Sequence, residues 1–174
     1  MRIYLIGFMG AGKTYWGRLL SKKLGIPFFD LDELVVNDEG KSINEIFEQE
    51  GEEHFRRKER EILEWVSDTH ESMILSCGGG APCFFNSIDY MNNKGITVWI
   101  DAPFEILLGR LRQQKETRPL LKALDDEQLK AYIVKKSNDR KIFYERAKVR
   151  IEDYEIKTDE FIKIIFDKTM TNPA

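Results

Sequence analysis

A glycine-rich stretch close to the start of the chain combines residue types that bind phosphate. Its sequence, Gly7-Phe-Met-Gly-Ala-Gly-Lys13-Thr14, fits the pattern G-x-x-x-x-G-K-[ST]. Glycines allow backbone conformations in which N–H groups surround phosphate oxygens, while the lysine reaches the β- and γ-phosphates and the Thr14 hydroxyl can hold Mg²⁺. A tight turn without a ligand is the other interpretation. An apolar strand before the turn and an amphipathic helix after it favour binding of a nucleoside triphosphate.

Two carboxylates, Asp30 and Asp32, occur in a second apolar segment. Alternation along a strand would place both side chains on one side. One carboxylate could then act near a metal ion, and the other could accept a proton from an attacking hydroxyl. Alternatively, Asp32 simply caps a helix that begins after it.

Several arginines could bind an anionic substrate. Arg56 precedes Glu59 by three residues on a predicted helix, so Glu59 can orient it, although a solvated charged surface is the alternative. Arg118 lies in a polar stretch that could close as a lid and bring a cation to the transferring phosphoryl group, unless it is an ordinary loop arginine. Arg140 lies on a late helix and could supply a second cation.

Three consecutive glycines, Gly78, Gly79 and Gly80, follow a third apolar segment. A run of glycines at the end of a strand favours close approach of a ligand to backbone N–H groups, although a sharp turn would also use glycine. Ser76, just before the run, is placed where it could support a metal site.

The elements that must position these residues alternate between strand and helix patterns. Strands are predicted at Arg2–Ile6, Phe28–Asp32, Met73–Cys77, Ile96–Ile100 and Val149–Ile151. Helices are predicted at Lys13–Leu24, Glu52–Ser67, Phe104–Leu111, from Asp125 to about Ala147, and at Thr158–Met170, with a capping box at Ser42–Glu45 and a mobile loop over Gln113–Leu124.

This alternation predicts a three-layer α/β/α fold with a central parallel sheet. Ligands of such sheets bind beyond the carboxyl ends of the strands. The glycine-rich loop, the two aspartates and the three glycines all follow strand ends, so the sequence predicts one site at one edge of the sheet.

Composition narrows the classes of function. The chain has 174 residues, 42% of them hydrophobic, and a net charge of −3, which suits one globular domain and gives no basic footprint for nucleic acid. No apolar run is long enough to cross a membrane. Cys77 and Cys83 form no CxxC pair, so reduced thiols in a cytoplasmic protein are expected.

The motifs taken together resemble those of the shikimate kinase family. The order and spacing of G-F-M-G-A-G-K-T, D-L-D, F-R-R-K-E, C-G-G-G-A, R-P-L-L and N-D-R-K-x-x-Y carry the resemblance, which extends from about residue 2 to the last helix. It implies a P-loop fold of the nucleoside-monophosphate-kinase type. It also implies transfer of the γ-phosphate of ATP to the 3-hydroxyl of shikimate, in chorismate and aromatic amino-acid biosynthesis, with Mg²⁺ as cofactor.

The resemblance also implies roles for individual residues. Asp32, Lys13 and Arg118 are the expected catalytic residues, and Thr14 and Asp30 the expected metal ligands. The nucleotide is expected to contact Gly10, Ala11, Gly12, Lys13, Thr14, Arg110 and Arg118, with Arg112 as the alternative to Arg110. Shikimate is expected to contact Asp32, Arg56, Gly78, Gly79, Gly80 and Arg140. One kinase domain is expected over residues 1–174, with a substrate-binding segment at about 31–60 and a lid at about 113–124.

Other functions remain open from the sequence alone. They are a kinase of another small metabolite such as gluconate or a nucleotide, a binding module without activity, and a nucleotide-driven switch. The presence of Lys13, Asp32 and Arg118 favours an active kinase. A monomer that binds small molecules, with neither nucleic acid nor membrane as partner, is expected.

Overall fold

A computed structural model describes residues 1–115, 119–153 and 155–170 of the chain. Its first half contains β1 (Arg2–Ile6), α1 (Lys13–Leu24), β2 (Phe28–Asp30), α2 (Leu31–Glu39), α3 (Ile43–Gln49), α4 (Gly51–Thr69) and β3 (Met73–Ser76). Its second half contains the 3-10 turn η1 (Ala81–Cys83), α5 (Ser87–Lys94), β4 (Ile96–Ile100), α6 (Phe104–Gln113), α7 (Pro119–Lys122), α8 (Asp126–Tyr144), β5 (Val149–Ile151) and α9 (Thr158–Met170).

The five strands form one parallel sheet in the order β2-β3-β1-β4-β5. The central strand β1 pairs with β3 on one side, Leu5 opposite Ser76, and with β4 on the other, Ile6 opposite Trp99. Because the strands are parallel, all their carboxyl ends lie at one edge. The predicted parallel sheet between helical layers is therefore confirmed.

Alternate residues of β1 face two separate apolar cores, as the period of a strand requires. Ile3 and Leu5 belong to a core shared with α1, α6, α8 and α9. Tyr4 and Ile6 belong to a core shared with α2, α3, α4 and α5. The sheet is thus covered on both faces, and its strands are buried as in other α/β proteins.

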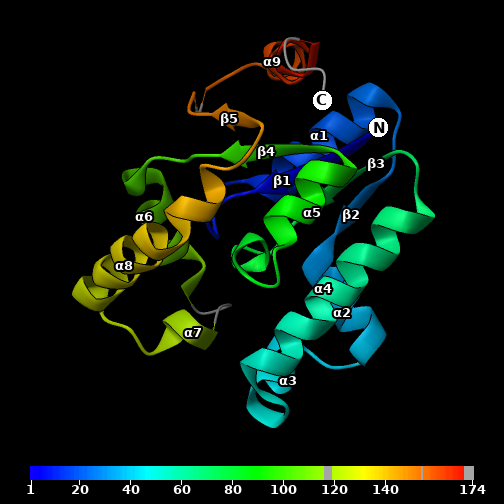
Figure 1. Ribbon diagram of the computed structural model, residues 1–174. Helices are drawn as coiled ribbons and strands as arrows, with labels where there is room; N and C mark the ends of the chain where they lie inside the picture. The colour runs from blue at the N-terminus through cyan, green and yellow to red at the C-terminus, as the bar shows by residue number, and fades with distance from the viewer. Residues whose placement is uncertain (116–118, 154, 171–174) are drawn as a thin grey trace.

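The helices near the carboxyl edge of the sheet lie in two groups. Figure 1 shows α2, α3 and α4 on one side of the view and α6 and α8 on the other, with α7 between them below the sheet. The site residues predicted from the sequence come from both groups and from the strand ends between them.

Some predicted element boundaries are wrong. The second strand ends at Asp30 instead of Asp32, and the stretch predicted as a loop over 113–124 contains the short helix α7. Helix α8 ends at Tyr144, before Ala147. The predicted capping box at Ser42 is present, and Asp125, where a helix was predicted to begin, also forms a capping box with Gln128.

Within the described part of the chain, no helix has the length and apolar character needed to cross a bilayer. Cys77 and Cys83 are both free thiols.

Candidate active site

The glycine-rich loop between β1 and α1 adopts a conformation that requires glycine. Gly10 has φ 80° and Gly12, the residue before α1, has φ 100°, a region that side chains disfavour. A Cβ on Gly7 would lie 2.6 Å from the carbonyl oxygen of Ile100. The loop therefore packs directly on the end of β4, and the first turn of α1 faces the carboxyl edge of the sheet.

Lys13 is held inside this loop. Its Nζ donates hydrogen bonds to the carbonyl oxygens of Gly7 and Phe8, both at 2.9 Å, and the residue is only 9% exposed. The ammonium group is therefore already aimed into the curve of the loop, where a phosphate would lie.

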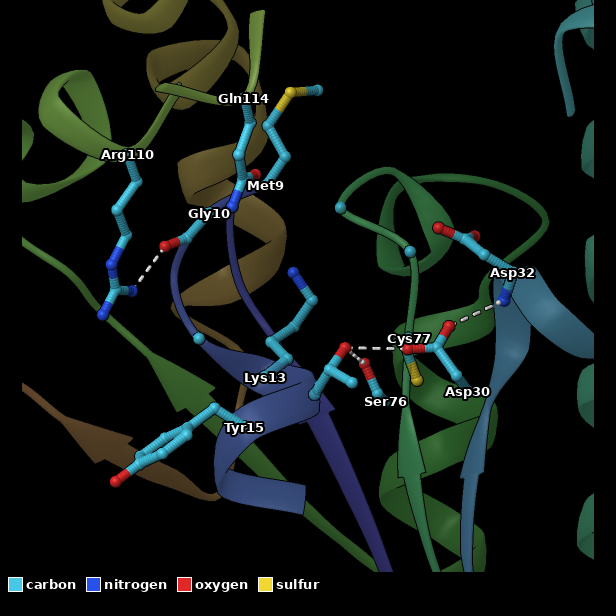
Figure 2. Close-up of a pocket in the computed structure, with 14 residues that line it drawn as sticks. Met9, Gly10, Lys13, Tyr15, Asp30, Asp32, Ser76, Cys77, Arg110 and Gln114 are labelled. Carbon is cyan, nitrogen blue, oxygen red and sulfur yellow. Dashed lines mark hydrogen bonds between the residues drawn. The ribbon is translucent and has the colours of Figure 1, made fainter. Parts of the chain in front are cut away.

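A cavity of about 370 Å³ opens beside Lys13. Figure 2 shows the lysine side chain rising between the glycine-rich loop and the ends of the neighbouring strands, while Tyr15 points away from them. Fourteen residues line the cavity: Met9, Gly10, Gly12, Lys13, Thr14, Tyr15, Asp30, Asp32, Ser76, Cys77, Gly78, Gly79, Arg110 and Gln114.

Thr14, Asp30 and Ser76 form a small oxygen cluster at the base of the cavity. Thr14 Oγ1 donates to Asp30 Oδ2 at 2.8 Å and lies 3.4 Å from Ser76 Oγ (Figure 2). One carboxylate and two hydroxyls are hard oxygen groups of the kind that Mg²⁺ prefers, and this ion commonly takes one or two protein ligands together with substrate phosphates. The donor set therefore fits a magnesium ion bound with a nucleotide.

The sequence predicted that Asp30 and Asp32 alternate along one strand, and this prediction is wrong. The strand ends at Asp30, whose Oδ1 accepts a hydrogen bond from the Asp32 backbone N–H at 3.1 Å and caps α2. Asp32 lies in the first turn of that helix. The alternative interpretation, in which an aspartate caps a helix, is correct, but the capping residue is Asp30 and not Asp32. Both residues nevertheless line the cavity.

The glycines after β3 provide space for charged side chains. A Cβ on Gly78 would lie 2.6 Å from Glu59 Oε1 and 2.8 Å from Asp32 Oδ1. A Cβ on Gly79 would lie 3.0 Å from Arg140 Nη1, and one on Gly80 would lie 2.6 Å from Arg56 Nη2. Side chains from α2, α4 and α8 therefore converge on this segment. The segment also makes the turn of the alternative interpretation, because the Ala81 N–H donates to the Gly78 carbonyl at 3.0 Å.

Arg56 and Glu59 form a buried ion pair on α4. Arg56 Nη1 donates to Glu59 Oε2 at 2.7 Å, and the two side chains are 8% and 3% exposed. The alternative of a solvated charged surface is thus wrong for Arg56, although it holds for its neighbour Arg57, which is 68% exposed. Burial raises the pKa of Glu59 to about 7, against the lowering effect of Arg56. Burial lowers the pKa of Arg56, but Glu59 and Glu52 together outweigh it and keep that pKa above its usual value.

The chain is similar to shikimate kinases in sequence and in structure. A model of the family described as shikimate kinase matches residues 9–170. The shikimate kinase of Parabacteroides distasonis is 38% identical over 97% of both chains. The crystal structure of shikimate kinase from Bacteroides thetaiotaomicron superimposes with a TM-score of 0.86 at 36% identity, covering 98% of this chain and 95% of the other. Shikimate kinase from Acinetobacter baumannii, solved in complex with shikimate, gives a TM-score of 0.82 at 33% identity, covering 98% and 93%.

The chain belongs to the shikimate kinase family. The predicted P-loop fold of the nucleoside-monophosphate-kinase type is confirmed. So is the predicted activity, ATP-dependent phosphorylation of shikimate to shikimate 3-phosphate.

Two arginines were candidates for the adenine side of this shikimate kinase site. Arg110 Nη1 donates to the carbonyl oxygen of Gly10 at 2.6 Å, and Arg110 lines the cavity (Figure 2). Arg112 instead makes two hydrogen bonds of 2.6 Å to Asp126 on the surface. The geometry favours Arg110. Arg118, the predicted lid arginine, lies outside the residues that the structure describes.

Sequence reasoning missed Tyr144 as part of the shikimate kinase site. Its hydroxyl donates to the carbonyl oxygen of Gly79 at 2.5 Å, and its ring lies 5.8 Å from that of Trp99. Tyr144 follows Arg140 by one helical turn, so both side chains face the glycine segment. That spacing within N-D-R-K-x-x-Y was the signal that could have identified it.

Proposed function

We propose that the cavity holds both substrates of the shikimate kinase reaction, with Lys13 and Asp32 on either side of the phosphoryl group in transfer. The observation that supports this most directly is that both residues line one cavity, although they come from different elements. The ammonium group provides positive charge for the phosphates, and the carboxylate can accept a proton.

On the nucleotide side, the backbone of Gly10, Ala11 and Gly12 and the first turn of α1 surround the phosphates. Thr14 and Asp30 hold Mg²⁺, which neutralises charge on the phosphate oxygens when bound. Arg110 contacts the adenine side, supported by its place over Gly10. Arg118 is assigned to the phosphates from the R-P-L-L pattern alone, within a lid at about 113–124.

On the acceptor side, Arg56 and Arg140 bind the carboxylate of shikimate, since both guanidinium groups converge on Gly79 and Gly80. The backbone of Gly78, Gly79 and Gly80 and the side chain of Asp32 contact the ring hydroxyls. The substrate-binding segment is about residues 31–60. The complex of the Acinetobacter baumannii relative with shikimate supports this choice of acceptor.

Asp32 accepts the proton of the 3-hydroxyl as that oxygen bonds to the γ-phosphorus and the bond to the β-phosphate oxygen breaks. Most of the rate enhancement then comes from positioning and electrostatic stabilisation by Lys13, Arg118 and the loop N–H groups. We further propose a cytoplasmic monomer with small molecules, and neither nucleic acid nor membrane, as its partners.

An ADP-release assay with shikimate and Mg²⁺-ATP tests the role of Asp32. We expect Asp32→Asn to lower kcat by at least about 100-fold, because the amide cannot accept the proton. Asp38→Asn is the matched control, since Asp38 is an exposed aspartate on the same helix, paired with Lys58 outside the cavity. Retention of kcat in Asp32→Asn would overturn the assignment. Turnover of gluconate with none of shikimate would overturn the choice of acceptor.

A further inference from the structure

Phe84 lies against the guanidinium group of Arg56, outside the residues assigned above. Its ring centroid is 4.7 Å from Arg56 Cζ, and that of Phe55 is 5.0 Å away. The guanidinium group therefore makes a hydrogen bond to Glu59 and lies over two aromatic rings, and it occupies the space that a Cβ on Gly80 would need. Cation–π attraction strengthens when the cation is removed from water, as it is here.

The backbone around Phe84 is held in a conformation that ordinary side chains disfavour. Phe85 and Asn86 have φ values of 50° and 55°, two consecutive non-glycine residues in the left-handed region. Such conformations cost free energy and persist only where the surrounding structure enforces them, often beside functional sites. They follow Phe84 directly.

Turns on both sides fix the direction of Phe84. The Cys83 N–H donates to the Gly80 carbonyl at 2.9 Å, and the Ser87 N–H donates to the Phe84 carbonyl at 2.9 Å. The segment that carries Phe84 is thus tied at one end to the glycine that Arg56 approaches and at the other to α5.

We propose that Phe84 is a positioning residue that holds the Arg56 guanidinium group in place for the substrate carboxylate. Phe84 itself is 37% exposed, whereas the Arg56 side chain is 8% exposed, so the ring covers the arginine from solvent. The inference rests on the proposed role of Arg56. It predicts that Phe84 affects shikimate binding and leaves ATP binding and the chemical step unchanged.

The neighbouring Phe85 provides a matched control. It is also aromatic and exposed, at 47%, but its ring lies 5.8 Å from Arg57, which points to the surface. We expect Phe84→Ala to raise KM for shikimate about 3- to 30-fold with kcat and KM for ATP within about twofold of wild type. We expect Phe85→Ala to leave all three constants unchanged.

Two further variants separate a cation–π role from simple packing. Phe84→Tyr keeps the aromatic face and should restore the wild-type KM. Phe84→Leu fills similar apolar volume without a π face and should behave as Phe84→Ala does. Wild-type KM in Phe84→Leu would overturn the proposal, and so would equal effects of Phe84→Ala and Phe85→Ala.

The Arg56→Ala background separates failure of this inference from failure of the proposed role of Arg56. Arg56→Ala should raise KM for shikimate, and adding Phe84→Ala should then cause no further rise. If Arg56→Ala itself leaves KM unchanged, the proposed carboxylate contact is wrong. If Arg56→Ala raises KM and Phe84→Ala raises it further by the same factor as in wild type, Phe84 does not act through Arg56.

Discussion

Glu59 is a buried carboxylate whose ionisation affects stability and which holds the proposed substrate residue Arg56. Its Oε1 has no hydrogen-bond partner among the described residues, and its Oε2 accepts from Arg56. Burial is the main cause that raises its pKa to about 7, and the Asp32 carboxylate adds to the shift, while Arg56 and Arg140 oppose it. When the free energy of removing two charges from water exceeds their mutual attraction, a buried ion pair lowers the stability of the fold. Such a pair can still fix the position of a side chain in a site.

The sign of the pH dependence follows from the two states of Glu59. An unfolded glutamate loses its proton near pH 4.5, whereas the folded protein keeps it to about pH 7. Between these values the folded state binds more protons, so this group's contribution to the free energy of unfolding falls as pH rises. The fall is on the order of 3 kcal/mol.

Glu59→Gln should therefore match wild-type stability near pH 4.5 and exceed it at pH 7.5, by up to about 3 kcal/mol. The same variant should raise KM for shikimate, because Arg56 loses its charged acceptor. Urea unfolding at both pH values measures the first effect, and steady-state kinetics measures the second. Glu53→Gln is the control, since Glu53 forms an exposed pair with Arg57 and should show no such change between the two pH values. A Glu59→Gln variant less stable than wild type at pH 7.5 would contradict the argument.

At the scale of elements, helix α1 and strand β2 must approach closely for Thr14 to meet Asp30. Gly17 on α1 makes this possible: a Cβ there would lie 2.2 Å from Cε2 of Phe28, on β2. The side chain of Phe28 therefore occupies the space that any larger residue would need. Thr14 lies nearly one turn earlier on α1, and Asp30 ends the strand that Phe28 begins.

Gly17→Ala should destabilise the protein by about 1 to 2 kcal/mol, although alanine is ordinarily the better helix residue. Gly109→Ala on α6 is the matched comparison, because a Cβ added at Gly109 would meet no neighbouring side chain or element within 4 Å. It should stabilise the protein by about 0.5 to 1 kcal/mol. Urea denaturation of both variants measures the two effects. Equal stabilisation by both would show that Phe28 moves aside freely.

The same elements show what sequence patterns can and cannot predict. β1, α1 and the glycine-rich loop were predicted correctly, because apolar periodicity and glycine placement are local signals. The Asp30–Asp32 prediction failed because a short strand and a capped helix share the same residues, and local sequence does not decide between them. Helix α5 was missed, since Asn86 starts it in the left-handed region without a side-chain cap.

Contacts between distant elements could not be predicted from sequence patterns alone, without the family resemblance. Arg140 meets Gly79 because α8 packs against η1, which directly follows the glycines, and Tyr144 reaches the same glycine from one turn further on. The spacing of Arg140 and Tyr144 places both on one face of the helix, but it does not show which segment that face meets. The three glycines were identified as a place of close approach, but the side chains that approach them depend on tertiary packing.

In the whole molecule, the nucleotide and the Arg56 part of the shikimate site are assigned to different halves. The nucleotide residues belong to α1 and α6, which pack in the core on one face of the sheet through Trp16, Leu20 and Leu108. Arg56 belongs to α4, which packs on the opposite face through Phe55 and Leu63. Arg140, the second arginine assigned to shikimate, lies on α8, which packs on the same face as α1 and α6. The central strand β1 separates the two cores, and at the carboxyl edge Asp32 of α2 lines the same cavity as Lys13 of α1.

Each ligand should therefore stabilise the protein through its own half. A ligand at about 100 times its dissociation constant adds about 2.7 kcal/mol, which corresponds to a rise in Tm of about 5 to 10 °C for a chain of this size. Wild-type protein should show such a rise with Mg²⁺-ATP and with shikimate separately. Lys13→Ala should lose the rise with Mg²⁺-ATP and keep the rise with shikimate, whereas Arg56→Ala should show the reverse.

Each variant is compared with itself without ligand, so a loss of intrinsic stability does not affect the result. The crossed pattern distinguishes two half-sites from a single shared one. Lys13 Nζ is held by the Gly7 and Phe8 carbonyls, whereas Arg56 lies on α4 and does not line the cavity beside Lys13, so the two substitutions act on separate groups. Loss of both shifts in both variants would mean that the two ligands depend on one interdependent site, and the division by sheet face would not hold.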